Sequence, residues 1–146
     1  MIVLDASALV DVVLDQRSAP WVLDQIADSE ISTPAHQPAE VLSALARLVR
    51  AAALEPLAAR EALEEALALP QRLVAPTAAH VRRAFALRER IRVVDGLYVA
   101  LADELGCPLV TTDRRLASAD APCEVRTPSV ESGGSAATPV PPPRGR

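Results

Sequence analysis

The chain opens with the stretch Met1-Ile-Val-Leu-Asp5-Ala-Ser7-Ala-Leu-Val-Asp11, in which an apolar run ends on a carboxylate. The run from Ile2 to Leu4 consists of β-forming residues without polar alternation, which is typical of a strand buried on both faces in a parallel sheet. Ser7 is a candidate helix N-cap, and apolar residues recur after it at helical spacing, so the strand is expected to turn directly into a helix. Asp5 is therefore predicted at the carboxyl end of a central strand, where open α/β sheets bind ligands.

The composition indicates a single domain with an aliphatic core. The chain has 146 residues, 50% of them hydrophobic, and only one Trp, one Tyr and one Phe, which favours helix-packed α/β architecture. A formal net charge of -4 argues against a protein that coats nucleic acid nonspecifically, but not against an enzyme acting on nucleic acid with bound cations. Two cysteines and no signal peptide favour a cytoplasmic protein without a disulfide. No apolar run is long enough to cross a membrane.

Strand-like and helix-like segments alternate along the rest of the chain. Further strands are predicted at residues 31–34, 72–76, 108–113 and 123–126, with amphipathic helices between them. The helix over residues 77–91 is expected to turn Val81, Ala84, Phe85 and Leu87 inward. Such alternation implies parallel strands joined by right-handed crossovers. We therefore predict a three-layer α/β fold, with a central parallel sheet of about four to five strands flanked by helices.

The composition changes from about Thr127. Residues 127–146 consist mainly of Pro, Gly, Ser, Ala and Thr, with almost no large apolar side chain. A segment of this kind cannot bury enough apolar surface to offset the entropy lost on ordering. We therefore predict a folded domain over residues 1–126 and a disordered tail over residues 127–146.

Four acidic residues are predicted to meet at one edge of the sheet. Asp5 and Asp113 follow strands, while Glu40 and Asp95 lie at the starts of helices, whose amino ends reach the same edge. Carboxylates about 4 Å apart repel by roughly 4 kcal/mol per pair at an effective dielectric constant of 20, so we expect crowding to raise all four pKa values. Oxygen ligands without nearby Cys or His favour Mg²⁺ or Mn²⁺, which can support phosphodiester cleavage.

Several neighbouring residues are weaker candidates. The hydroxyls of Ser7 and Thr112 are placed to orient a carboxylate or a metal-bound water, although an ordinary role as a helix cap or strand hydroxyl is the more common one for such residues. Three arginines are candidate contacts to phosphates, with an ordinary surface role as the alternative for each: Arg47, on the helix face of Glu40, and Arg114 and Arg115, beside Asp113. His36 and His80 lack metal-ligand spacing and are assigned no role.

These residues lie in motifs that resemble those of a known family. The chain is similar to PIN-domain ribonucleases of the VapC toxin type in its opening strand followed by Asp5-Ala-Ser-Ala-Leu and in the Glu at the head of a long helix. Two further motifs are Asp95-Gly-Leu-Tyr-Val-Ala-Leu-Ala and Leu109-Val-Thr-Thr-Asp-Arg-Arg-Leu. The similarity covers residues 1 to about 126, and the order and spacing of the motifs make it specific. Gly96 is a mild departure, since Ala is frequent there.

The resemblance implies a PIN-like fold and a metal-dependent endoribonuclease toxin that hydrolyses structured RNA with Mg²⁺ or Mn²⁺. It further implies a VapB-like antitoxin, expected on the surface helices of residues 18–69, and a homodimer. The family's site residues fall here on Asp5, Glu40, Asp95 and Asp113, with the small hydroxyl residue at Ser7.

Other functions compete with this interpretation. A non-catalytic PIN-like binding or regulatory module would keep the fold, but it would be free to lose one of the four acids. A metal-dependent phosphatase or phospho-acceptor usually carries a second Asp two residues after the first, where this chain has Ser7. Asp5 alone is also explained as a helix cap. The presence of all four acids favours the nuclease.

Overall fold

The strand formed by the opening residues lies at the centre of the sheet. The structure is a computed structural model that describes residues 1–129; most of the predicted tail therefore lies outside the described residues. Five strands pair in the order β3-β2-β1-β4-β5, and all pairs are parallel. They are β1 (Ile2–Leu4), β2 (Ile31–Pro34), β3 (Arg72–Val74), β4 (Leu109–Val110) and β5 (Val125–Arg126). The side chains of β1 are at most 2% exposed, as expected for a strand covered on both faces.

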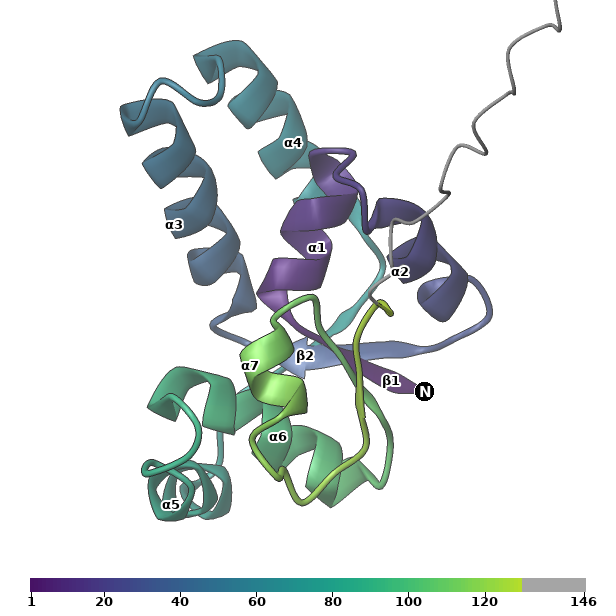
Figure 1. Ribbon diagram of the computed structural model, residues 1–146, viewed down its shortest axis with the longest axis vertical. Coiled ribbons are helices and arrows are strands. Elements are labelled where there is room, and N and C mark those ends of the chain that lie inside the picture. Colours follow the sequence, from purple (N-terminus) through teal and green to yellow (C-terminus); the bar gives the residue numbers. More distant parts are fainter. Residues whose placement is uncertain (130–146) are drawn as a thin grey trace, which may run out of the picture.

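Helices cover both faces of this sheet, which confirms the predicted three-layer α/β architecture (Figure 1). One layer packs α2, α3 and α4 around α1, and the other packs α5 against α6, which contacts the three central strands. The α3–α4 hairpin projects away from the sheet. The helices are α1 (Ala6–Val13), α2 (Ala19–Ile26), α3 (Gln37–Arg50), α4 (Pro56–Ala68), α5 (Ala78–Ala86), α6 (Val93–Leu105) and α7 (Arg114–Ala117).

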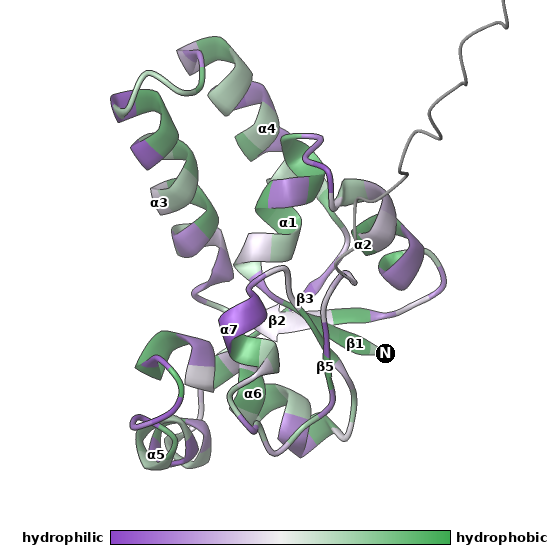
Figure 2. Cartoon of the chain, in the orientation of Figure 1, coloured by the Kyte–Doolittle hydropathy of each residue, from purple (hydrophilic) through white to green (hydrophobic). Residues whose placement is uncertain are grey.

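The core is aliphatic and follows the strands and the inner helix faces, as Figure 2 shows by the hydrophobic colour of β1 and α6. Tyr98 on α6 is the largest fully buried side chain. Cys107 and Cys123 are free thiols, as predicted. In residues 1–129, no helix combines the length and the apolar character needed to cross a membrane.

Two local predictions are wrong. The N-cap of α1 is Asp5 rather than Ser7, because the helix begins directly at Ala6. In α5, Val81 and Phe85 are 54% and 60% exposed instead of inward-facing. This helix packs mainly against α6, so it buries a narrow face, and the predicted helix over residues 77–91 ends at Ala86.

Gly96 has a packing reason that explains its departure from the family pattern. A Cβ atom built at Gly96 would lie 3.0 Å from both Cα and Cβ of Ala84 on the neighbouring helix. Ala84 is fully buried, so neither residue has room for a larger side chain. The absence of a side chain at Gly96 therefore lets α5 pack closely on α6, directly beside the predicted site residue Asp95.

Candidate active site

Asp5 joins β1 to α1, which places its carboxylate at the carboxyl edge of the sheet. Its backbone is extended, with φ -76° and ψ 149°, and its side chain makes no capping hydrogen bond to α1. Helix capping therefore does not explain this residue. Asp5 is only 6% exposed. Burial raises the pKa of its carboxyl above the ordinary value; nearby hydroxyls oppose this shift and the charge of Glu40 adds to it.

Two hydroxyl groups hold the Asp5 carboxylate. Ser7 Oγ and Thr111 Oγ1 each donate a hydrogen bond to Asp5 Oδ2 at 2.6 Å. Thr111 directly follows β4 and is fully buried, so this contact connects the ends of two neighbouring strands. Both bonds go to one oxygen. Among the described residues, no side-chain donor contacts Asp5 Oδ1.

The structure assigns the second hydroxyl to Thr111 and not to Thr112. Only the backbone N–H of Thr112 takes part, donating to Ser7 Oγ at 3.2 Å. Successive side chains in extended backbone point to opposite sides, so an error of one residue exchanges an inward hydroxyl for an outward one. Ser7 makes the carboxylate contact that was expected of it.

Glu40 is fixed by two neighbours that were not predicted. Tyr98 Oη donates to Glu40 Oε2 at 2.5 Å, and His36 Nε2 lies 3.4 Å from the same oxygen. Although burial alone would raise it, these neighbours lower the pKa of Glu40 below the ordinary value. The rings of His36 and Tyr98 meet edge to face, with centroids 5.1 Å apart. Glu40 is thus held as an ionised carboxylate in the first turn of α3.

Asp95 lies in the first turn of α6, with a side chain that is 15% exposed. Burial raises the pKa of Asp95 to about 6, and the charges of Asp5, Glu40 and Asp113 add to this effect. Arg92 opposes it, with Nε 3.8 Å from Asp95 Oδ2. Because three other acids influence Asp95, all four carboxylates share one electrostatic environment.

Asp113 forms a tight ion pair with Arg115 at the start of α7. The guanidinium donates from Nε to Oδ1 at 3.1 Å and from Nη2 to Oδ2 at 2.7 Å, and the Arg115 backbone N–H donates to Oδ1 at 3.0 Å. These contacts lower the pKa of Asp113. Arg115, predicted as an RNA contact, is therefore engaged with a site carboxylate.

The other two candidate arginines differ in their distance from the acids. Arg114 is exposed beside Asp113. Arg47 lies seven residues beyond Glu40 on α3, which corresponds to about 10 Å along the helix axis. No contact to a site carboxylate links Arg47 to the acidic edge among the described residues.

The prediction that crowding raises all four pKa values is wrong for two of the acids. The pKa is raised for Asp5 and Asp95, where burial is the largest cause, and lowered for Glu40 and Asp113. The reason is that the fold supplies partners for these two acids, namely His36 and the Tyr98 hydroxyl at Glu40 and Arg115 at Asp113. These partners outweigh repulsion between the carboxylates.

The donor set of this edge suits a hard divalent cation. Within residues 1–129, no three acidic, histidine or cysteine side chains are already gathered as a ligand set. The Asp5 and Asp95 carboxylates nevertheless supply acceptor oxygens, and a hollow of about 140 Å³ is lined by Asp95 and Asp113 together with three arginines, Arg90, Arg92 and Arg115. Mg²⁺ and Mn²⁺ prefer oxygen ligands, so a set of four carboxylates without a thiolate suits either ion.

Four residues near the acids were missed, although the spacing contained signals for them. His36 precedes Glu40 by four residues, and Arg92 precedes Asp95 by three, so each pair lies on one helix face. Tyr98 follows Asp95 by three residues on α6 and faces the same side. Thr111 would have followed from the alternation of the strand before it.

Comparison with known proteins agrees with these observations. A model of the PIN domain matches residues 2–122. Ribonuclease VapC3 of Mycobacterium tuberculosis is 41% identical over 121 residues, which cover 81% of this chain and 86% of that protein. Ribonuclease VapC12 of the same organism is 38% identical over 117 residues, covering 80% of this chain and 90% of the relative.

Two solved structures share the fold at low sequence identity. VapC20 of Mycobacterium tuberculosis, described as a sarcin-ricin loop cleaving toxin, gives a TM-score of 0.62 at 18% identity and covers 83% of this chain and 96% of its own. VapBC2 from Rickettsia felis, bound to a DNA fragment from its promoter, gives a TM-score of 0.64 at 16% identity and covers 87% and 98%. Since the domain model spans most of the chain and relatives at 38% and 41% identity cover about four fifths of it, the chain belongs to the VapC ribonucleases of the PIN-domain family.

Proposed function

We propose that this protein is the toxin of a toxin–antitoxin pair and hydrolyses phosphodiester bonds in structured RNA at the edge formed by Asp5, Glu40, Asp95 and Asp113. The observation that carries this proposal is the electrostatic coupling of the four acids, which lie far apart in the sequence. Family membership supports it, because the relatives are named as ribonucleases and PIN-domain VapC ribonucleases generally depend on a divalent metal.

The chain's own residues prepare the site for the ion and for RNA. Ser7 and Thr111 fix one oxygen of Asp5, and His36 and Tyr98 hold Glu40 in its ionised form. We assign Mg²⁺ or Mn²⁺ to the four carboxylates; when bound there, such an ion acts as a Lewis acid toward water and phosphate.

The two arginines at the site balance its negative charge in the free protein. Arg92 and Arg115 lie against Asp95 and Asp113, and their side chains are 64% and 76% exposed. Exposed guanidinium groups can exchange a carboxylate partner for a phosphate oxygen at low cost. We expect both to contact the RNA backbone once cations neutralise the acids.

The test is cleavage of a structured RNA with Mg²⁺ or Mn²⁺ and with excess chelator. We expect cleavage only with metal, and none from Asp5→Asn or Asp95→Asn, while far-UV circular dichroism stays unchanged. Asp24→Asn on α2 is the matched control, because this exposed carboxylate lies outside the acidic edge. Full activity of the site variants, or of the wild type in chelator, would contradict the proposal and favour a non-catalytic module.

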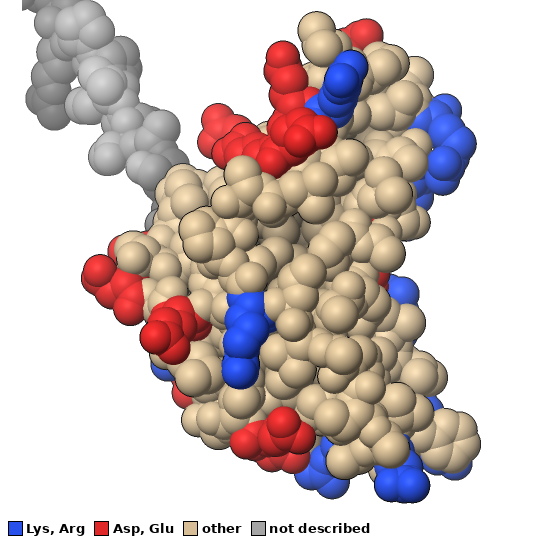
Figure 3. All heavy atoms as spheres, turned by 180° about the vertical axis from the view of Figure 1, so that it is seen from behind, with Lys and Arg blue, Asp and Glu red and all other residues tan. Residues whose placement is uncertain are grey.

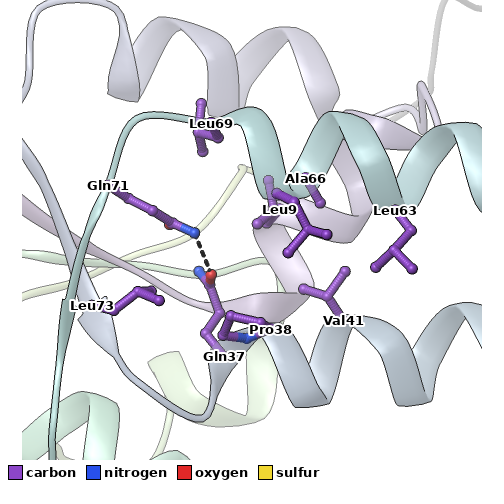
Figure 4. Close-up of a pocket in the computed structure, with 10 residues that line it drawn as sticks. Leu9, Gln37, Pro38, Val41, Leu63, Ala66, Leu69, Gln71 and Leu73 are labelled. Carbon is purple, nitrogen blue, oxygen red and sulfur yellow. Dashed lines mark hydrogen bonds between the residues drawn. The ribbon is translucent and has the colours of Figure 1, made fainter.

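The antitoxin is proposed to bind the α3–α4 side of the molecule. Leu42, Leu57 and Leu67 are 52%, 68% and 57% exposed there. A hollow of about 90 Å³ opens among apolar side chains of α1, α3, α4 and β3, with a hydrogen bond between Gln71 and Gln37 at one end (Figure 4). Exposed apolar surface of this kind is typical of a protein-binding site.

The partner is tested by co-expression with the small protein encoded next to this gene. We expect the toxin alone to arrest growth, and the pair to restore growth and co-purify. Leu67→Asp should weaken the complex without affecting RNA cleavage, because it changes the apolar surface and not the acidic edge. Failure of both rescue and co-purification would indicate a free-standing nuclease.

A further inference from the structure

A large hollow lies next to the acidic edge, between the α1–α2 turn and the start of α7. Its volume is about 620 Å³, compared with about 140 Å³ for the hollow between Asp95 and Asp113. Pockets of a few hundred Å³ accommodate ligands of nucleotide size. Its lining includes Asp11, Gln16, Arg17, Trp21, Thr112 and Arg114.

Hydrogen bonds connect one wall of this hollow to the proposed site. The Thr112 backbone N–H donates to Ser7 Oγ at 3.2 Å, and Ser7 Oγ donates to Asp5 Oδ2 at 2.6 Å. On the same wall, Arg114 directly follows Asp113. An RNA strand that places a phosphate at the acids therefore has its neighbouring nucleotide within reach of the hollow.

The two arginines of the hollow are free to bind phosphate. Arg17 and Arg114 are exposed, and neither has a carboxylate within ion-pair distance among residues 1–129, whereas Arg92 and Arg115 are paired with site acids. The one acid in the lining, Asp11, accepts a hydrogen bond from Ser18 Oγ at 2.5 Å. The hollow thus contains two arginine side chains without an ion-pair partner, and the nearby Asp11 carboxylate is hydrogen-bonded to Ser18.

The hollow also contains the only tryptophan of the chain. Trp21 on α2 is half-buried, so part of the indole is anchored against the core and part lines the hollow. An aromatic side chain between arginines is the usual platform for an unpaired base. In contrast, the face in Figure 3 shows Arg side chains as separate patches among acidic ones, without a continuous basic surface for RNA.

We propose that this hollow binds one unpaired RNA nucleotide next to the scissile phosphate, with its base stacked on Trp21 and its flanking phosphates held by Arg17 and Arg114. The inference rests on the proposed ribonuclease function and adds to it a nucleotide-binding subsite outside the acidic edge. Stacking accepts any base, so this contact selects unpaired nucleotides rather than a particular sequence.

The experiment measures binding separately from cleavage. An RNA hairpin with an unpaired loop is added to the full-length protein in chelator, and Trp21, as the single tryptophan, reports base stacking by its fluorescence. We expect quenching on binding. With a dye-labelled hairpin, Trp21→Leu should bind about tenfold more weakly, and Trp21→Phe should recover part of the loss because it keeps an aromatic ring.

Charge variants test the phosphate contacts. Arg17→Gln and Arg114→Gln should each weaken binding and reduce the slope of log affinity against log salt by about 0.7, the value for one phosphate contact on single-stranded nucleic acid. Arg82→Gln is the matched control, because Arg82 is also exposed and unpaired within the described residues but lies on α5, away from α2 (Figure 1).

The outcomes separate this inference from the proposed function. Metal-dependent cleavage by the wild type without quenching, or with equal binding by Trp21→Leu, would overturn the inference and leave the nuclease proposal intact. Absence of both binding and cleavage would overturn both. If Trp21→Leu loses the antitoxin but binds RNA normally, the hollow is a protein interface and the inference is wrong.

Discussion

Removing the charge of Asp95 should stabilise the protein in the absence of metal. The pKa of Asp95 is raised from 3.8 to about 6, which corresponds to about 3 kcal/mol at about 1.4 kcal/mol per pH unit. Because the carboxylate has partial contact with solvent, screening reduces this to about 1–2 kcal/mol. Asp95→Asn should therefore raise the melting temperature at pH 7 by roughly 4–8 °C.

The sign of the effect depends on pH. Between about pH 4 and pH 6, folded Asp95 keeps a proton that the unfolded chain has released, so wild-type stability falls as pH rises through this window and stays lower above it. The variant lacks this loss. The gain in stability of Asp95→Asn over the wild type should therefore be absent at pH 4 and reach its full size by pH 7.

Thermal melts followed by far-UV circular dichroism in chelator, from pH 4 to pH 7.5, measure this difference. Asp24→Asn, at an exposed position on α2, is the control and should show no gain that develops across the window. The reasoning would be refuted by parallel pH curves for wild type and Asp95→Asn, or by a variant that melts lower at pH 7. Added Mn²⁺ should stabilise the wild type by mass action and the variant much less.

Three further substitutions test the surroundings of the site. Tyr98→Phe removes the hydrogen bond to Glu40, so the pKa of Glu40 should rise and the acidic limb of the pH–activity profile should move to higher pH; an unchanged limb would contradict this role. Thr111→Val removes a hydrogen-bond donor from Asp5 and should reduce RNA cleavage about tenfold or more. Thr112→Val should reduce cleavage much less, and equal losses would contradict the assignment of the hydroxyl contact to Thr111. Gly96→Ala should lower the melting temperature in spite of its better helix propensity, because its Cβ would lie 3.0 Å from Ala84; a raised melting temperature would show that α5 yields easily.

The parallel sheet and the position of the acids follow from local sequence patterns. An unbroken apolar run ending at Asp5 predicts a central strand, and β1 is indeed the middle strand of five. Glu40 and Asp95 lie in the first turns of α3 and α6, as their places ahead of apolar helical patterns predict. These predictions succeed because strand burial and helix starts depend on residues near in sequence.

Features that depend on distant neighbours were not predictable in the same way. The apolar spacing of Val81 and Phe85 indicates a buried helix face, but these side chains stay exposed because α5 packs mainly against one other helix, α6. The lowered pKa of Glu40 depends on His36, four residues earlier, and also on Tyr98, which is 58 residues away along the chain.

The central claim is that Asp5, Glu40, Asp95 and Asp113 act together as one metal site. The most direct test is Mn²⁺ binding, measured by calorimetry, to the wild type and to the four single variants Asp5→Asn, Glu40→Gln, Asp95→Asn and Asp113→Asn. The account predicts saturable binding by the wild type and a loss of about tenfold or more in affinity in each variant, because each removes a ligand from a shared site. Wild-type affinity retained in all four variants, or no saturable binding by the folded wild type, would contradict it.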